Sequence, residues 1–183
     1  MDKIKRCRWC NQNNPQYVEY HDNEWGQQNL NEHYLYEMFI LETFQAGLSW
    51  ECILNKREYF RKAFDDFDIE KIILYNEEKI EELINNPQIV RNKLKIITSI
   101  ENSKIYYNIM KEFGSFGNYL KNFAGNEVIY DYNHPTSHLS DTISADLKKR
   151  GMKFVGSVTI HSYLQAIGLI YSHEPECFLY KTI

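Results

Sequence analysis

Aromatic and polar side chains are concentrated in two short segments of this chain, Tyr17–Gly26 (YVEYHDNEWG) and Leu41–Trp50 (LETFQAGLSW). Aromatic faces attract a planar cation, and a nearby carboxylate favours positive charge. The two segments therefore favour a pocket for a flat, positively charged ring. The alternative is that these aromatic side chains fill the core, which is the commoner place for them.

Glu42 is the carboxylate that stands out, because it lies in the otherwise apolar stretch Met38–Phe44. A carboxylate on a buried face destabilises the fold unless it has a partner, so it is a candidate for a functional role. The alternative places Glu42 at a helix end, facing solvent. We expect the nearby Glu19, Asp22 and Glu24 to be structural.

Four candidate metal ligands lie at the two ends of the chain: Cys7, His21, His173 and Cys177. The last two have an H-x3-C spacing, which suits two ligands of a tetrahedral zinc ion. A closed four-ligand zinc site would join the ends, stabilise the fold and lie remote from the chemistry. Two alternatives stay open on spacing alone. The four residues are unrelated, or Cys10, which forms a C-x2-C pair with Cys7, replaces His21.

The composition is that of an ordinary globular protein and predicts one domain over residues 1–183, with 43% hydrophobic and 25% charged residues. The net charge of −4 argues mildly against a nucleic-acid partner, but basic residues gather locally, as at Arg91, Lys93 and Lys95. No signal peptide, membrane span or disulfide framework is evident. We therefore expect a protein of the reducing cytoplasm.

The elements that position these residues are predicted to be helices, and we expect an all-α fold. Only 8 Gly and 4 Pro interrupt the chain, and no segment alternates over enough positions to predict a strand. Apolar periodicity, caps and breaks predict helices over residues 32–46, 51–64, 91–113, 140–149 and 157–167. Ser140 is the expected cap of the fourth, and Asn76 of a short helix that ends before Asn86-Pro87.

The strings YVEYHDNEWG, FQAGLSW and LKKRGMKFVG resemble those of the 3-methyladenine DNA glycosylase I family. The resemblance extends from Cys7 to Cys177, nearly the whole chain, and its strings are long and ordered. It implies a helical DNA-glycosylase fold with a helix–hairpin–helix element near residues 84–97. It also implies a structural zinc ion on Cys7, His21, His173 and Cys177. The implied activity initiates base excision repair: a methylated adenine, flipped out of DNA, is cut from its sugar by hydrolysis of the N-glycosidic bond.

This reaction assigns roles to the residues of the two segments. An adenine methylated at N3 is already positively charged, so it leaves without being protonated. We expect Glu42 to be the catalytic carboxylate that holds this base by its edge. The rings expected to stack on the base are Tyr20, Trp50, Trp9 and Trp25.

Two places in the sequence are expected to contact DNA. Gly47-Leu48 lies between two predicted helices, where an apolar side chain suits a wedge between bases. The alternative to this wedge is that Leu48 belongs to the core. The break near residues 86–93, with Arg91 and Lys93, would offer backbone N–H groups and a helix N-terminus to a phosphate. Its alternative is an ordinary helical corner.

Two other classes of function stay open. A non-catalytic, zinc-stapled helical protein would bind damaged or single-stranded nucleic acid by stacking, and would release no free base from methylated DNA. A small-molecule enzyme with an aromatic pocket would bind its ligand without regard to DNA. For the leading function, we expect double-stranded DNA with an alkylated adenine as the partner and a monomeric protein, because DNA is bound asymmetrically.

Overall fold

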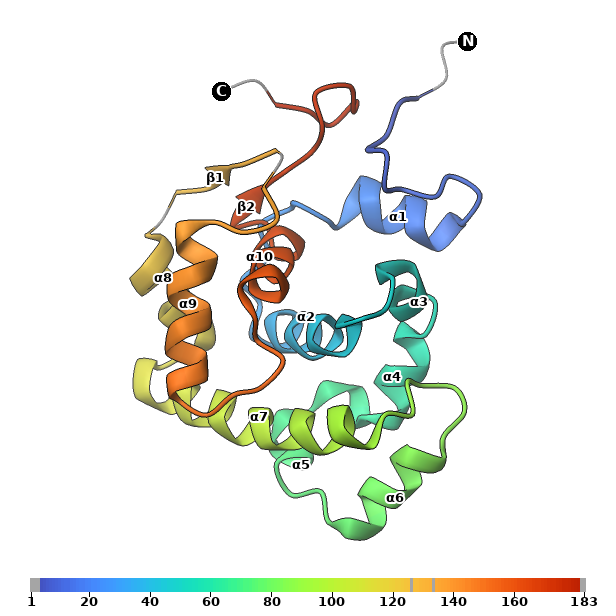
Figure 1. Ribbon diagram of the computed structural model, residues 1–183, viewed down its shortest axis with the longest axis vertical. Coiled ribbons are helices and arrows are strands. Elements are labelled where there is room, and N and C mark those ends of the chain that lie inside the picture. The colour runs from blue at the N-terminus through green and yellow to red at the C-terminus, as the bar shows by residue number, and fades with distance from the viewer. Residues whose placement is uncertain (1–3, 126, 133, 182–183) are drawn as a thin grey trace.

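The computed structural model describes residues 4–125, 127–132 and 134–181 of the chain, and it is mostly helical (Figure 1). Its elements in chain order are α1 (Pro15–Asn23), α2 (Glu32–Gln45), α3 (Trp50–Leu54), α4 (Arg57–Ala63), the 3₁₀ helix η1 (Asp65–Phe67), α5 (Ile69–Ile72), α6 (Glu77–Asn85), α7 (Lys93–Phe113), α8 (Phe116–Ala124), β1 (Ile129–Tyr130), α9 (His138–Lys149), α10 (Ser157–Ala166) and β2 (Ile170–Tyr171).

Helix α2 lies at the centre of the molecule, with other helices around it (Figure 1). It packs against α3, α7, α8 and α10, and every residue from Leu35 to Phe44 is buried. The spacing of apolar residues suggested one buried face. The structure instead buries the whole circumference, as is typical of a helix that is apolar all round. Glu42 is therefore buried, and the alternative that it faces solvent at a helix end is wrong.

Helices α6 and α7 are joined by residues 86–92, where the sequence predicted a break. Asn76 caps α6 as predicted, because its side chain accepts a hydrogen bond from a backbone N–H of the first turn. Asn92 caps α7 in the same way, so this helix begins at Lys93 and not at Arg91. The two helices and their connection form one side of the molecule below α2 (Figure 1).

Local capping also changes the bounds of two other predicted helices. The helix expected over residues 51–64 is two short helices, α3 and α4, because the chain turns at Asn55 and Lys56. Helix α9 is capped by Ser137 and not by Ser140. Ser140 is the third residue of the helix and completes a capping box with Ser137.

Two short strands depart from the all-α expectation. β1 and β2 pair in parallel, with Ile129 opposite Ile170 and Tyr130 opposite Tyr171. Each strand has two residues. Alternation of apolar and polar residues cannot show over so short a length, because a strand is recognised from at least four positions or so. The expectation of an entirely helical fold is therefore wrong in this detail.

The two ends of the described chain lie on the same side of the molecule (Figure 1). The backbone N–H of Phe178 donates a hydrogen bond to the carbonyl oxygen of Lys5 at 2.9 Å, which ties the last segment to the first. Within the described residues, no helix combines the length and the apolar character needed to cross a membrane.

Candidate active site and metal centre

A cavity of about 270 Å³ lies between the N-terminal segment, α1, α2, the start of α3 and α10. Its lining includes every residue to which the sequence gives a role at the base: Glu42, Tyr20, Trp50, Trp9 and Trp25. Glu42 comes from the central helix, Tyr20 from α1 and Trp50 from the first turn of α3. The fold thus brings residues from separate segments to one place.

The carboxyl of Glu42 is almost completely enclosed, with 3% of the residue exposed. Its Oε2 has no hydrogen-bond partner among the described residues. Burial alone raises the pKa of Glu42 to about 8. With this pKa the carboxyl is mostly protonated at neutral pH, and a cation placed beside it would favour the ionised form.

Aromatic rings form much of the cavity wall. The rings of Tyr20 and Trp50 have centroids 5.4 Å apart and planes inclined by 47°. Burial holds the pKa of Tyr20 well above its ordinary value, so its hydroxyl stays neutral. The indole Nε1 of Trp50 is also buried without a hydrogen-bond partner among the described residues. Unpartnered buried polar atoms are rare in proteins, so a cavity with two of them in aromatic walls suits a flat ligand with polar edges.

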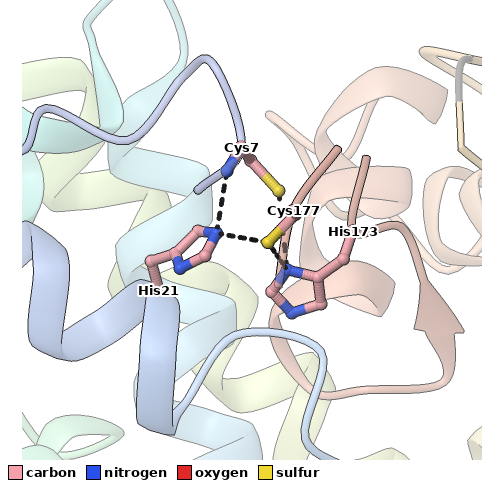
Figure 2. Close-up of side chains that lie close together, drawn as sticks. All are labelled: Cys7, His21, His173 and Cys177. Atoms are coloured by element: carbon pink, nitrogen blue, oxygen red, sulfur yellow. Dashed lines mark hydrogen bonds between the residues drawn. The ribbon is translucent and has the colours of Figure 1, made fainter. Parts of the chain in front are cut away.

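The second group of residues lies between the two ends of the chain, where four side chains face one another (Figure 2). The candidate ligand atoms of Cys7, His21, His173 and Cys177 all lie within 4.8 Å of one another, and all four residues are buried. The Sγ of Cys7 is 3.5 Å from the Nδ1 of His173, and the Sγ of Cys177 is 3.5 Å from the Nε2 of His21. This group could hold a metal ion.

The two imidazoles are held by partners on their far sides. The Nδ1 of His21 lies 2.7 Å from a carboxylate oxygen of Asp22, which in turn accepts hydrogen bonds from the guanidinium of Arg6. The Nε2 of His173 lies 3.3 Å from the backbone carbonyl of Trp25. Partners of this kind fix the ring orientation and the tautomer of metal-binding histidines.

The protonation of this group also suits a cation. The backbone N–H groups of Glu174 and Leu179 donate to the thiol sulfurs of Cys7 and Cys177, respectively. Burial lowers the pKa of His173 to about 4, so its imidazole is neutral and has a free lone pair. Burial raises the pKa of Cys7 to about 12, so a thiolate at this place needs a compensating positive charge.

Cys10 lies outside this group. Its thiol donates instead to the backbone carbonyl of Tyr17, with a sulfur–oxygen distance of 3.8 Å. The structure therefore favours His21, and not Cys10, as the companion of Cys7. The pairing suggested by the C-x2-C spacing does not form a group with the C-terminal residues.

The candidate metal-binding group, formed by Cys7, His21, His173 and Cys177, shares a wall with the cavity, so the two are not remote from each other. The ring of Trp9 is 5.1 Å from that of His21, and the ring of Trp25 is 4.7 Å from that of His173, measured between centroids. The two indoles also contact each other, with centroids 4.8 Å apart. Because Trp9 and Trp25 line the cavity as well, the candidate ligands support its wall from behind.

The turn between α2 and α3 is open to solvent. Gly47 has a φ of +79°, which favours glycine, and an added Cβ would meet no heavy atom within 4 Å. Leu48 is 40% exposed, so the alternative that it belongs to the core is wrong. The exposed pair Gly47-Leu48 is hereafter called the tip.

The basic cluster near the start of α7 divides into two kinds of residue. Arg91 and Lys93 are exposed and have no ion-pair partner among the described residues. Lys95 is 8% exposed, and its ammonium donates to the backbone carbonyls of Phe44 and Ala46. Only the first two can therefore reach a phosphate outside the protein.

Four further residues line the cavity and had no role assigned from the sequence: Tyr17, Gln45, Ser162 and Gln165. The first two lie within the aromatic segments Tyr17–Gly26 and Leu41–Trp50, so their position in the sequence could have indicated a place in the cavity. The last two come from α10, whose apolar periodicity marks a core helix and carries no sign of a ligand site. Their place in the cavity depends on the packing of α10 against α2.

Fold and site together define a mostly helical protein with a buried carboxyl inside an aromatic cavity and, between its ends, a Cys and His group that could hold a metal ion. The sequence profile of the methyladenine glycosylase family matches residues 9–180. A relative from Escherichia coli, DNA-3-methyladenine glycosylase 1, is 37% identical over an alignment that covers 97% of this chain and 97% of that protein. The chain belongs to the methyladenine glycosylase family.

Solved structures agree with this membership. A crystal structure of 3-methyladenine DNA glycosylase I superposes with a TM-score of 0.91 at 36% identity, covering 97% of this chain and 100% of that one. A tyrosine-to-phenylalanine variant of 3-methyladenine DNA glycosylase I, solved in complex with 3-methyladenine, gives a TM-score of 0.90 at 31% identity. It covers 98% of this chain and 99% of that one.

Proposed function

We propose that this protein is a DNA-3-methyladenine glycosylase, which excises 3-methyladenine from alkylated DNA by hydrolysis of the N-glycosidic bond. The observation that carries the proposal is the unpartnered carboxyl of Glu42 inside the aromatic cavity of a member of this family. The relative from Escherichia coli bears the name of this activity, and one structural neighbour was solved with 3-methyladenine bound. The reaction starts base excision repair.

The proposed reaction requires the protein to recognise the positive charge of the methylated base more than to donate a proton to it. Methylation at N3 makes the adenine a cation in DNA, so cleavage of the glycosidic bond releases a neutral base without prior protonation. The faces of Tyr20 and Trp50 would attract that cation, which contributes about 0.5–2 kcal/mol. A carboxylate of Glu42 would add an attraction that normal adenine does not receive, and its oxygen would accept a hydrogen bond from the edge of the base.

Flipping of the base out of the DNA duplex strengthens the preference for methylated adenine over normal adenine. Flipping a base out of duplex DNA costs a few kcal/mol, and a damaged or poorly paired base costs least. The charge preference of the cavity and the lower flipping cost act in the same direction. Selectivity between methylated and normal adenine therefore does not require a proton donor.

Two exposed features would contact the DNA. The tip at Gly47-Leu48 would enter the duplex in place of the extruded base, since an apolar side chain on an open turn suits a wedge between bases. Residues 86–92 and the start of α7 would act as the hairpin of a helix–hairpin–helix element. There, backbone N–H groups and the cations Arg91 and Lys93 would meet a phosphate.

The metal-binding group is proposed to hold a structural zinc ion. Bonds of about 2.3 Å to sulfur and about 2.0 Å to nitrogen, at tetrahedral angles, separate sulfur and nitrogen by about 3.5 Å. The observed distances are 3.5 Å for Cys7–His173 and Cys177–His21, and 3.6 Å for Cys177–His173. With two thiols and two imidazoles the coordination is complete, so the ion would stabilise the fold and leave no position for a catalytic water.

The remaining parts of the proposal concern the whole protein. One glycosylase domain spanning residues 1–183 would act as a monomer on double-stranded DNA that contains an alkylated adenine. Its asymmetric DNA-facing surface, with a single tip, supports the monomer. Four free cysteines support work in the reducing cytoplasm, where thiols stay available to a metal.

The experiment that tests the function measures 3-methyladenine released from methylated duplex DNA. The parent protein should release it, and Glu42→Gln, which keeps the shape and removes the charge, should release it at least about tenfold more slowly. Glu78→Gln is the matched control, because Glu78 is exposed on α6 and should not matter. A parent protein that binds methylated DNA and releases no base would instead be a non-catalytic binding module.

The role of the tip is tested by Leu48→Ala. We expect a folded protein that binds duplex DNA more weakly and still binds free 3-methyladenine. Leu74→Ala removes another exposed leucine, 78% exposed in the turn between α5 and α6, and should leave both kinds of binding unchanged. Equal DNA binding by Leu48→Ala and the parent would show that the tip does not enter the duplex.

A further inference from the structure

One lysine of the basic cluster points into the protein. Lys95 lies in the first turn of α7, two residues after the exposed Lys93, yet it is 8% exposed. Its Nζ donates to the carbonyl oxygen of Phe44 at 2.7 Å and to that of Ala46 at 2.5 Å. These two acceptors belong to the C-terminal end of α2 and to the residue before the tip.

The end of α2 needs such a donor. The last carbonyl groups of a helix have no partner within the helix, and they carry the negative end of its dipole. The C-cap Ala46 has non-helical backbone angles, with a φ of −44° and a ψ of 114°, and its backbone N–H makes no capping hydrogen bond within the described residues. The ammonium of Lys95 supplies both the missing donors and the complementary charge.

This contact joins the two features that are proposed to meet DNA. On one side, Lys95 follows directly after the hairpin, and the backbone N–H of Lys95 is bonded by the cap Asn92. On the other side, Ala46 precedes the tip, where an added Cβ on Gly47 would meet open space. The side chain thus spans from the start of α7 to the root of the tip.

We propose that Lys95 is a positioning residue, which fixes the tip at Gly47-Leu48 relative to the hairpin so that phosphate contact and insertion of Leu48 occur in one rigid arrangement. This inference rests on the proposed function. A direct contact between Lys95 and phosphate does not fit the structure, because its ammonium is enclosed and directed at backbone carbonyls. The exposed Lys93 is the better placed cation for that purpose.

The test compares Lys95→Met, which keeps an unbranched side chain as far as Cε and removes the ammonium, with Lys93→Met. For Lys95→Met we expect excision at saturating duplex to fall between about 10- and 100-fold, because small misplacements of a working group have effects of that size. Duplex affinity should keep its dependence on salt, and free 3-methyladenine should bind as it does to the parent. For Lys93→Met the salt slope should instead decrease by about one.

Insertion of the tip is followed separately from catalysis. A duplex with an abasic-site analogue and 2-aminopurine on the opposite strand should fluoresce when the parent inserts Leu48, and less when Lys95→Met binds. Lys95→Arg, which still donates to both carbonyls, should recover part of the signal and of the excision. Lys95→Met and Leu48→Ala should not be additive, since both remove the same insertion.

Several results would overturn the proposal. A salt slope lowered by about one in Lys95→Met would make Lys95 a phosphate contact. Unchanged insertion, full additivity with Leu48→Ala, or loss of free-base binding together with a lower melting temperature would also reject the positioning role. If Lys95→Met does not fold, Lys95→Gln, which is shorter and uncharged, is measured in its place with the same expectations. A parent protein that inserts its tip and releases no 3-methyladenine would reject the proposed function and leave the positioning role supported.

Discussion

At the scale of single residues, the charge of Glu42 depends on what lies beside its carboxyl. Its carboxyl is enclosed on the central helix and has an oxygen without a partner among the described residues. Burial raises its pKa to about 8, so the carboxyl is mostly neutral at pH 7. A cationic base would lower this pKa by direct attraction, and binding at neutral pH would then release a proton. The enclosed carboxyl therefore becomes charged when its proposed ligand arrives.

Excision should accordingly depend on pH through Glu42. The methylated adenine in DNA stays positively charged between pH 6 and 8, while the fraction of ionised Glu42 in the free protein rises. We expect kcat/KM for release of 3-methyladenine to increase over this range, by up to about tenfold per pH unit, and to level off above the pKa of about 8. Glu42→Gln should show a flat profile. The same rise in Glu42→Gln would assign the dependence to another group.

The same pKa predicts how stability varies with pH. Between about pH 4.5 and pH 8, unfolded Glu42 is ionised while folded Glu42 keeps its proton, so the unfolded state binds fewer protons. The contribution of this residue to the free energy of unfolding therefore decreases as pH rises through this window. Glu42→Gln removes that penalty. Its melting temperature should exceed that of the parent, by a margin that grows from pH 5 to pH 8, and calorimetry at several pH values checks this.

At the scale of elements, the cavity depends on close approach between α10 and the segment after α1. The backbone N–H of Gly26 donates to the carbonyl of Gln165, and that of Asn29 to the carbonyl of Ile167. Gly168, just after the end of α10, has a φ of +72°. Trp25 and Gln165, which flank these contacts, both belong to the lining of the cavity. The joint between the two elements therefore supports the cavity wall.

Gly168→Ala should be severely destabilising for this reason. An added Cβ would lie 2.3 Å from the backbone nitrogen of Gln28, and backbone atoms cannot move aside easily. We expect a loss of roughly 4 kcal/mol or more in the free energy of unfolding, or failure to fold. Gly156→Ala is the control, because its added Cβ meets open space, and it should cost about 1 kcal/mol or less. Denaturant titration of the two variants tests the close approach: equal stability would contradict it.

At the scale of the whole molecule, the two ends of the chain are organised by one group of residues. The N-terminal segment contributes Cys7 and the C-terminal segment contributes His173 and Cys177, with His21 from α1 between them (Figure 2). A metal ion at this place would close nearly the whole chain into a loop, which lowers the entropy of the unfolded state. Because the indoles of Trp9 and Trp25 rest on the two imidazoles, its loss should also disturb the cavity.

Metal removal should therefore lower stability and activity together. Cys177→Ser or a strong chelator should remove zinc and, by analogy with other links between chain ends, cost about 3 kcal/mol. That loss corresponds to a melting temperature lower by roughly 6–12 °C for a chain of this size. Cys10→Ser should keep its zinc and melt like the parent, because Cys10 is bonded elsewhere. Elemental analysis measures the zinc content and calorimetry measures the melting temperature. Purified parent protein without zinc would contradict the proposed zinc site.

The sequence by itself determined the mostly helical class, the main helices and the family resemblance, because these are recorded in local signals. Apolar residues at helical spacing, caps such as Asn76 and the break before α7 act between neighbours along the chain. Glu42 could be singled out because a carboxylate within an apolar run conflicts with its neighbours. Local signals also explain the errors: Ser137 and Ser140 are both good caps, and strands of two residues are too short to leave a pattern.

Only the tertiary structure decided which of several candidate residues lie together in a site. Lys93 and Lys95 look alike in sequence, but packing of α7 against α2 turns one outward and encloses the other. On spacing alone Cys10 was an open alternative to the predicted His21, and the fold groups His21, not Cys10, with Cys7, His173 and Cys177. Ser162 reached the cavity because α10 packs on the central helix. Burial and contact between distant segments are properties of the whole packed chain, so spacing along the sequence cannot specify them.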